Sequence, residues 1–236
     1  MKKIYHLTMA ILISGPAFAQ QDADRYFRQA LQAYESANYR EAAARFSQAI
    51  QADSFFTEAY VLRGICSQEL MNYSSALEDY KKAISITPKD TVLYLMKADL
   101  EAEMGERLAA IVDYSAAIAL DPFNADTYRS RAAVYYSLDH YVLALDDYRK
   151  AISLNPSSGV DYFSAGVCLN IIEEYEQAVP YFSAAALFEP GEPAVYFNRG
   201  ISYHATGKIA EACADWRKAS EAGFEEAKRM LEERCD

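Results

Sequence analysis

The chain has 236 residues, of which 52% are hydrophobic, so it can bury a substantial core. Its formal net charge is -11 at pH 7. Such an acidic surface repels phosphate backbones and helps to keep a protein in solution, so we expect no nucleic-acid partner.

The first nineteen residues have the three-part layout of a secretory signal peptide. Lys2 and Lys3 form a positive end, residues 4–14 are mostly apolar, and Ala17 and Ala19 are small residues of the kind that a signal peptidase recognises. The apolar run is too short for a stable membrane-spanning helix. We therefore expect cleavage after Ala19, a periplasmic or secreted protein, and no integral membrane span after cleavage. An uncleaved N-terminal anchor is the alternative.

From residue 23 onward the sequence repeats every 34 residues. One tyrosine ladder and two alanine ladders keep this period through six copies without a slip. A strict period of this length predicts a solenoid of stacked supersecondary units. The ladders are Tyr26, Tyr60, Tyr94, Tyr128, Tyr162 and Tyr196; Ala42, Ala76, Ala110, Ala144, Ala178 and Ala212; and Ala49, Ala83, Ala117, Ala151, Ala185 and Ala219.

Each repeat has the apolar spacing of two helices. A turn is expected near positions 14 to 16 of the repeat, and a proline at position 32 ends the second helix in four copies. After a short lead at residues 20–22, the repeats are 23–56, 57–90, 91–124, 125–158, 159–192 and 193–226, and residues 227–236 are expected to form a capping helix.

Small residues mark where the two helices of a repeat should come closest. Position 8 is Ala or Gly in every copy and position 20 is always Ala, so we expect these two positions to face each other. Aromatic residues at position 24 should fill the neighbouring layer. They are Phe46, Tyr80, Tyr114, Tyr148, Phe182 and Trp216.

Charged residues at positions 7 and 23 occur together. The four repeats with Lys or Arg at position 7 have Asp at position 23, and the two repeats without the cation also lack the acid. On two antiparallel helices these positions are neighbours. We therefore predict a structural ion pair within each of the four repeats: Arg63 with Asp79, Lys97 with Asp113, Arg131 with Asp147, and Arg199 with Asp215.

The recurring order of aromatic, small residue, Ala, aromatic, Ala and Pro resembles the tetratricopeptide repeat family over residues 23–226. The resemblance implies an all-α fold, namely a right-handed superhelical solenoid of six 34-residue helix–turn–helix repeats plus a C-terminal capping helix. It also implies that the first helices line a concave face and that the partner is a protein or a peptide.

Positions on the concave face are the partner-binding candidates that the resemblance implies. Most are apolar, which favours a groove for a partner peptide. The alternative is that these side chains pack between adjacent first helices. Only Arg129 fits the basic clamp with which some family members bind acidic chaperone peptides, so we expect no strongly anionic ligand. The candidates are Phe27, Leu31, Val61, Ile65, Leu95, Arg129, Phe163, Val167, Phe197 and Ile201.

No catalytic motif stands out in the sequence. Of the three histidines, His6 lies in the signal segment, His140 in a turn and His204 alone on a first helix. There is no paired Cys/His spacing, phosphate-binding glycine loop or nucleophile motif. We therefore expect no enzyme activity, no cofactor and no metal site.

Four cysteines in an exported protein invite pairing. Cys66 and Cys168 are three repeats apart and should be buried thiols. Gly223 ends the last second helix, and one further helix would bring Cys235 level with Cys213. A disulfide between these two residues is predicted, with two free thiols as the alternative.

These observations predict an exported scaffold for protein–protein interaction, which binds a peptide or partner segment along its concave face. The alternative is a cell-envelope accessory protein that binds sugar or lipid ligands. That function would need aromatic side chains directed toward an open groove.

Overall fold

The computed structural model describes residues 16–235. This part of the chain contains thirteen α-helices and no β-strand. Most of the predicted signal peptide lies outside the described residues, and its last four residues begin the first helix. The chain divides into two compact units between Leu93 and Tyr94, in the first turn of α5.

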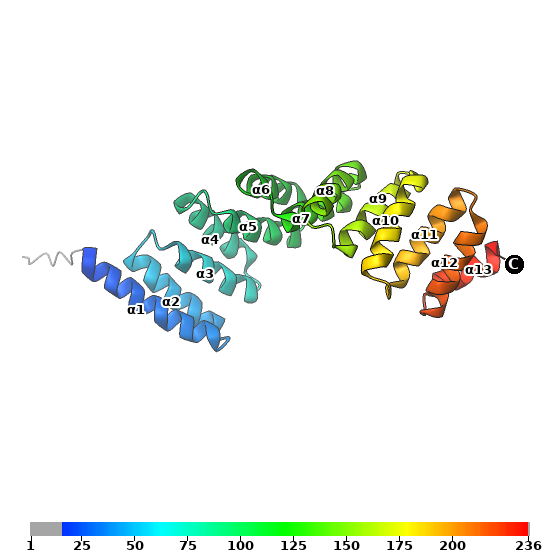
Figure 1. Ribbon diagram of the computed structural model, residues 1–236. Helices are drawn as coiled ribbons and strands as arrows, with labels where there is room; N and C mark the ends of the chain where they lie inside the picture. The colour runs from blue at the N-terminus through cyan, green and yellow to red at the C-terminus, as the bar shows by residue number, and fades with distance from the viewer. Residues whose placement is uncertain (1–15, 236) are drawn as a thin grey trace, which may run out of the picture. The chain divides into compact units, whose positions relative to one another are not determined.

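Unit 1 consists of two helical hairpins, in which each helix packs against the next along the chain (Figure 1). Its core is formed around the fully buried side chains of Phe46 and Cys66. The first helix is longer than the others because it extends N-terminally from the repeat pattern. The helices are α1 (Pro16–Glu35), α2 (Tyr39–Ala52), α3 (Thr57–Glu69) and α4 (Tyr73–Ile86).

Unit 2 continues the same arrangement of helical hairpins and ends in a single helix, α13, that packs against α12 (Figure 1). The largest of its fully buried side chains is Trp216 in the last hairpin. The helices are α5 (Thr91–Glu103), α6 (Arg107–Leu120), α7 (Ala125–Ser137), α8 (Tyr141–Leu154), α9 (Gly159–Ile171), α10 (Tyr175–Phe188), α11 (Pro193–Ala205), α12 (Ile209–Glu221) and α13 (Glu225–Arg234).

The tight turn of every hairpin uses the same left-handed backbone conformation. The residue at position 15 of each repeat has a φ angle between 56° and 82°. Glycine adopts this conformation without steric cost, whereas other L-residues lose about 1–2 kcal/mol. Only two of the six turns use glycine. The six residues are Ala37, Met71, Gly105, Asp139, Glu173 and Gly207.

Alanine and glycine allow the helices to pack closely. Every alanine of the two ladders is fully buried. In the three copies with glycine at position 8, the atoms nearest to a Cβ atom added there belong to the aromatic ring at position 24. A Cβ atom added to Gly200 would lie 2.5 Å from Nε1 of Trp216, and one added to Gly166 would lie 2.8 Å from Cε1 of Phe182. In these copies the placement of the ring leaves no room for a Cβ atom at position 8.

The structure confirms all four predicted ion pairs within repeats. In three of them the guanidinium group holds both oxygens of the carboxylate, a geometry that strengthens each hydrogen bond. In the fourth, Lys97 binds Asp113 and also lies 2.7 Å from Oε1 of Glu101. The three bidentate pairs are Arg63 with Asp79, Arg131 with Asp147, and Arg199 with Asp215.

A third helix takes part in each of the three arginine clusters. Nη1 of the arginine donates to a serine hydroxyl in the second helix of the preceding repeat, at distances of 2.8 to 3.1 Å. The clusters occur in the second, fourth and sixth repeats, so this arrangement recurs every second repeat. The donor and acceptor pairs are Arg63 and Ser47, Arg131 and Ser115, and Arg199 and Ser183.

Candidate partner-binding site

We use the name first-helix face for the side of each unit that the first helices of its hairpins form. All ten predicted partner-binding residues lie on these helices, and all ten are half-buried. Eight of them pack partly against the hydrophobic core, so packing accounts for much of their apolar character. These eight are Phe27, Leu31, Val61, Leu95, Phe163, Val167, Phe197 and Ile201.

Two of the predicted aromatic residues are covered by other rings. Phe27 stacks on Phe56 with 4.6 Å between ring centroids. Phe197 lies 4.9 Å from Phe224, which precedes the last helix. Both rings thus connect a first helix to the segment that follows the hairpin.

The side chains of Phe163 and Val167 line an open pocket in unit 2. The pocket has a volume of about 230 Å³ and lies between α7, α8 and α9. Its other lining residues are Tyr136, Tyr148 and Ser164. Four of these five side chains are apolar or aromatic, so the pocket suits an apolar group of a ligand. We call it the α7–α9 pocket.

Hydroxyl groups give the α7–α9 pocket a polar component. Burial raises the pKa of the Tyr148 phenol to about 12, and it also raises the pKa of the Tyr136 phenol. Both phenols therefore stay protonated at neutral pH and can donate hydrogen bonds. Ser164 adds a third hydroxyl group. An apolar ligand side chain could bind here while its backbone carbonyl groups accept hydrogen bonds.

A pocket with related geometry occurs one repeat earlier in the same unit. It has a volume of about 320 Å³, and its lining includes Ala102, Tyr114, Ser130 and Ala133. These residues stand at the same repeat positions as Tyr136, Tyr148, Ser164 and Val167. Tyr114 donates a hydrogen bond to Asp99 at 2.5 Å. The fold therefore places a pocket at this site in two successive repeats, and the α7–α9 pocket is the more aromatic one.

Arg129, the only predicted cation of the first-helix face, is held by carboxylates. Its Nε and Nη2 donate to the two oxygens of Asp161 at 2.5 and 2.8 Å, and its Nη1 donates to Asp126 at 2.5 Å. Asp161 is fully buried. These hydrogen bonds raise the pKa of Arg129 above its usual value, so the guanidinium stays charged, and the carboxylates of Asp161 and Asp126 balance its charge. The residue joins α7 to α9, and it does not offer a free cation to an anionic ligand.

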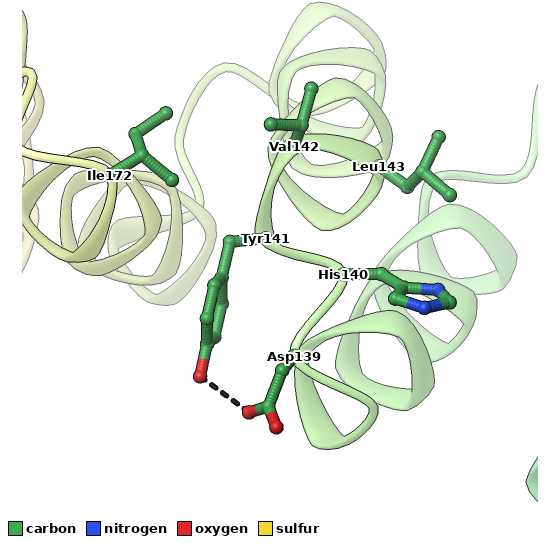
Figure 2. A pocket seen from close by; sticks show the side chains of 6 residues that line it. All are labelled: Asp139, His140, Tyr141, Val142, Leu143 and Ile172. Carbon is green, nitrogen blue, oxygen red and sulfur yellow. Dashed lines mark hydrogen bonds between the residues drawn. The ribbon is translucent and has the colours of Figure 1, made fainter.

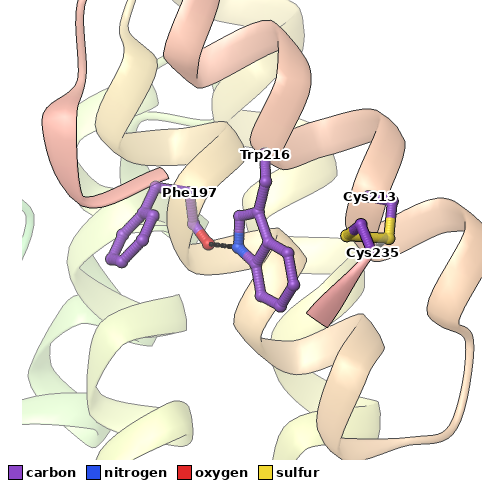
Figure 3. Close-up of a disulfide and its surroundings, with 4 residues drawn as sticks. All are labelled: Phe197, Cys213, Trp216 and Cys235. Carbon is purple, nitrogen blue, oxygen red and sulfur yellow. Dashed lines mark hydrogen bonds between the residues drawn. A yellow bond between two sulfur atoms is a disulfide. The ribbon is translucent and has the colours of Figure 1, made fainter. Parts of the chain in front are cut away.

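The C-terminal cysteines are joined. Cys213 and Cys235 form a disulfide that connects α12 to the end of α13 (Figure 3). Cys66 and Cys168 are free and buried, and burial raises the pKa of both thiols to about 11. Such thiols are poor nucleophiles at neutral pH because the thiolate is the reactive form.

Residues 16–235 show neither a membrane-spanning helix nor a cluster of metal-binding side chains. No helix there combines enough length and hydropathy to cross a lipid bilayer. In the same range, no three His, Cys, Asp or Glu side chains come together in a group that could hold a metal ion.

Three family models match the chain. Two models of the tetratricopeptide repeat match residues 27–91 and 125–158, and a model named TPR repeat matches residues 98–139. The chain belongs to the tetratricopeptide repeat family. No curated protein matches it in sequence.

Solved structures show the same fold at low sequence identity. The MamA protein is 23% identical with a TM-score of 0.67, and the match covers 73% of this chain and 94% of that chain. YrrB is 21% identical with a TM-score of 0.67, over 75% of this chain and 92% of that chain. PilF from Pseudomonas aeruginosa is 15% identical with a TM-score of 0.67, and the match covers 89% of this chain and 98% of that chain. The protein is thus an all-α tetratricopeptide solenoid.

Sequence reasoning missed three residues of the α7–α9 pocket of this tetratricopeptide array. Tyr136 stands at position 12, which the family exposes on the first-helix face, so a tyrosine there was an available signal. Tyr148 was assigned to the layer of buried rings, and it is indeed buried, but it also lines the pocket. Nothing in the sequence distinguishes Ser164 from a surface serine.

Proposed function

We propose that this protein is an exported scaffold for protein–protein interaction, and that its α7–α9 pocket binds an apolar side chain of an extended partner segment. The observation that carries the proposal is the lining of the pocket by Tyr136, Tyr148, Phe163 and Val167. These aromatic and apolar walls stand beside hydroxyl groups that can bind the backbone of a peptide.

The size of the pocket favours a side chain over a larger ligand. Its volume of about 230 Å³ is below the roughly 300–1,000 Å³ that is typical of small-molecule sites. A sugar chain or a lipid would need more enclosed space. Fold similarity adds support, because YrrB is described as a tetratricopeptide protein with an unusual peptide-binding site.

Peptide selection on the purified protein tests this function. Phage-displayed peptides of twelve residues would be selected, and the dissociation constants of the enriched sequences would be measured by calorimetry. We expect the enriched peptides to share one Leu, Met or Phe anchor. Val167→Ser should weaken their binding by about 1–2 kcal/mol, because it removes apolar contact inside the pocket.

Ile201→Ser provides the matched control. Ile201 occupies the same position in the next repeat, where it packs beside the core and lines no described pocket. Circular dichroism would show whether either variant is less folded. Equal weakening by both substitutions, or a loss of binding that only follows the folded fraction, would refute the α7–α9 pocket as the binding site.

Export is the second part of the proposal. It is supported by the N-terminal pattern of Lys2, Lys3, the apolar run and Ala19, and by a disulfide, which persists in oxidising compartments. N-terminal sequencing of protein from the periplasmic or culture fraction should begin at Gln20. An intact Met1 on the protein in the cytoplasmic fraction would contradict export.

A further inference from the structure

A second apolar hollow lies at the turn between α7 and α8 (Figure 2). Its volume is about 340 Å³. In Figure 2 the side chains of Tyr141 and Asp139 extend to one side of the turn, and those of Val142 and Leu143 lie on the other. We call this site the turn hollow. It is lined by Asp139, His140, Tyr141, Val142, Leu143 and Ile172.

The fold does not require apolar side chains in the turn hollow. Val142 is 58% exposed and Leu143 is 47% exposed. Apolar side chains that the core does not use are typical of interaction surfaces. The same two positions hold polar or small residues in four other repeats, namely Arg40 and Glu41, Ser74 and Ser75, Glu176 and Gln177, and Ala210 and Glu211.

The turn hollow adjoins the α7–α9 pocket. Tyr136 lines the pocket and Tyr141 lines the hollow, and their rings meet edge to face with centroids 5.3 Å apart. An extended chain advances about 3.3–3.6 Å per residue, so two side chains roughly three to five residues apart can reach both sites. A single segment can therefore fill the pocket and the hollow together.

The rim of the turn hollow is acidic. The carboxylate of Asp139 accepts a hydrogen bond from the Tyr141 hydroxyl at 2.5 Å, which holds it beside the hollow. Glu173 directly follows Ile172 and is exposed. No Lys or Arg belongs to the residues that line the hollow. A ligand that carries a positive charge next to its apolar anchor is complementary to this rim.

We propose that one extended partner segment occupies both the α7–α9 pocket and the turn hollow, with two apolar anchors and a Lys or Arg beside the second anchor. The proposal rests on the proposed function, to which it adds a second contact and a charge requirement. A second copy of this chain is a poor occupant, because each copy has a net charge of -11 and would bring an acidic rim of its own.

A set of synthetic peptides tests the proposal with the full-length purified protein. Each labelled peptide has twelve residues of Gly and Ser with either one Leu or two Leu residues that are one to eight positions apart. Every two-Leu peptide is made with Lys and with Glu next to the second Leu. Dissociation constants come from fluorescence anisotropy at low salt, where charge effects are largest.

Two surface variants provide the comparison. Val142→Asp places a carboxylate in the turn hollow. Leu108→Asp is the matched control, because Leu108 occupies the same repeat position one repeat earlier, is 71% exposed and lines no described pocket. Both substitutions lie in the first turn of a helix, where Asp is well tolerated.

The proposal expects the tightest binding for two Leu residues three to five positions apart, at least tenfold tighter than for one Leu. Lys peptides should bind at least fivefold tighter than Glu peptides. Val142→Asp should lower the affinity for two-Leu peptides to that for one-Leu peptides, and Leu108→Asp should leave the affinity for two-Leu peptides unchanged.

Other results overturn the proposal in recognisable ways. If one-Leu peptides bind as tightly as two-Leu peptides and only Val167→Ser weakens them, the proposed function stands and the second contact is refuted. If no peptide binds, both proposals fail. If the protein forms a dimer in sedimentation experiments and Val142→Asp dissociates it, the occupant of the turn hollow is a second copy.

Discussion

Replacing Gly200 by alanine should force the last hairpin to repack. The new Cβ atom would lie 2.5 Å from Nε1 and 2.6 Å from Cδ1 of Trp216, far inside the usual contact distance of about 3.5–4.0 Å. The indole ring is fully buried, and its Nε1 donates to the carbonyl oxygen of Phe197 at 3.2 Å (Figure 3). The ring therefore has to move, and its movement weakens this hydrogen bond.

Three contributions set the size of the effect. Overpacking a well-packed core costs about 1–3 kcal/mol. A weakened hydrogen bond adds about 1 kcal/mol. The higher helix propensity of alanine offsets about 1 kcal/mol. The free energy of unfolding of the last hairpin should therefore fall by about 1–3 kcal/mol.

Trp216 makes this change directly measurable, because it is the only tryptophan in the chain. Its fluorescence during urea unfolding reports the last hairpin, and the midpoint should shift to lower urea in Gly200→Ala. Gly191→Ala is the control, since a Cβ atom there meets nothing within 4 Å. Adding Trp216→Tyr should restore part of the stability seen by circular dichroism, because the fourth repeat combines Ala132 with Tyr148. Unchanged stability in Gly200→Ala would refute the claim that Trp216 leaves no room for a side chain at position 200.

Three other predictions concern the repeat framework. Cys235→Ser should destabilise α13 by about 3 kcal/mol according to the chain-entropy model of disulfides, and amide exchange should become faster in that helix alone. Unchanged exchange would show that packing against α12 holds α13 in place without the disulfide. Asp147→Ala should lower the free energy of unfolding, measured with urea, by about 2–4 kcal/mol, because it leaves the half-buried guanidinium of Arg131 without its carboxylate partner. A change near zero would mean that water replaces the carboxylate. Glu173→Gly should raise the free energy of unfolding and Gly105→Ala should lower it, each by about 1 kcal/mol, because both turns require a positive φ angle. The thermal midpoint should move up and down accordingly, and shifts in the opposite directions would contradict the strain argument.

The repeat framework could be predicted from the sequence because its signals are periodic. Ala42 and its counterparts are fully buried in every copy, and Arg63 pairs with Asp79 as their joint occurrence predicted. The serine partner was missed although its signal was present. Ser47, Ser115 and Ser183 each occur in the repeat before an arginine at position 7. This relation becomes visible only when the serine of one repeat is compared with the arginine and aspartate of the next.

The candidate site was harder to predict because it depends on partial exposure. Phe163 and Phe197 occupy the same repeat position, yet one lines a pocket and the other is covered by Phe224. Arg129 looked available to a ligand, but a buried aspartate in the next repeat binds it. Periodicity identifies which residues are equivalent, whereas exposure follows from the particular neighbours of each copy.

The alternation of the arginine and serine clusters makes a pair of repeats the modular unit of this protein. An internal duplication or deletion of 68 residues keeps each arginine of the clusters next to a serine. Deletion of the third or fifth repeat alone, or duplication of the second or fourth alone, instead brings an arginine beside Lys81 or Arg149, the residues at the serine position in the second and fourth repeats. Arrays of this lineage should therefore gain and lose repeats two at a time. Engineers who lengthen the array should splice whole pairs, since the junction within each pair carries the arginine–serine hydrogen bond.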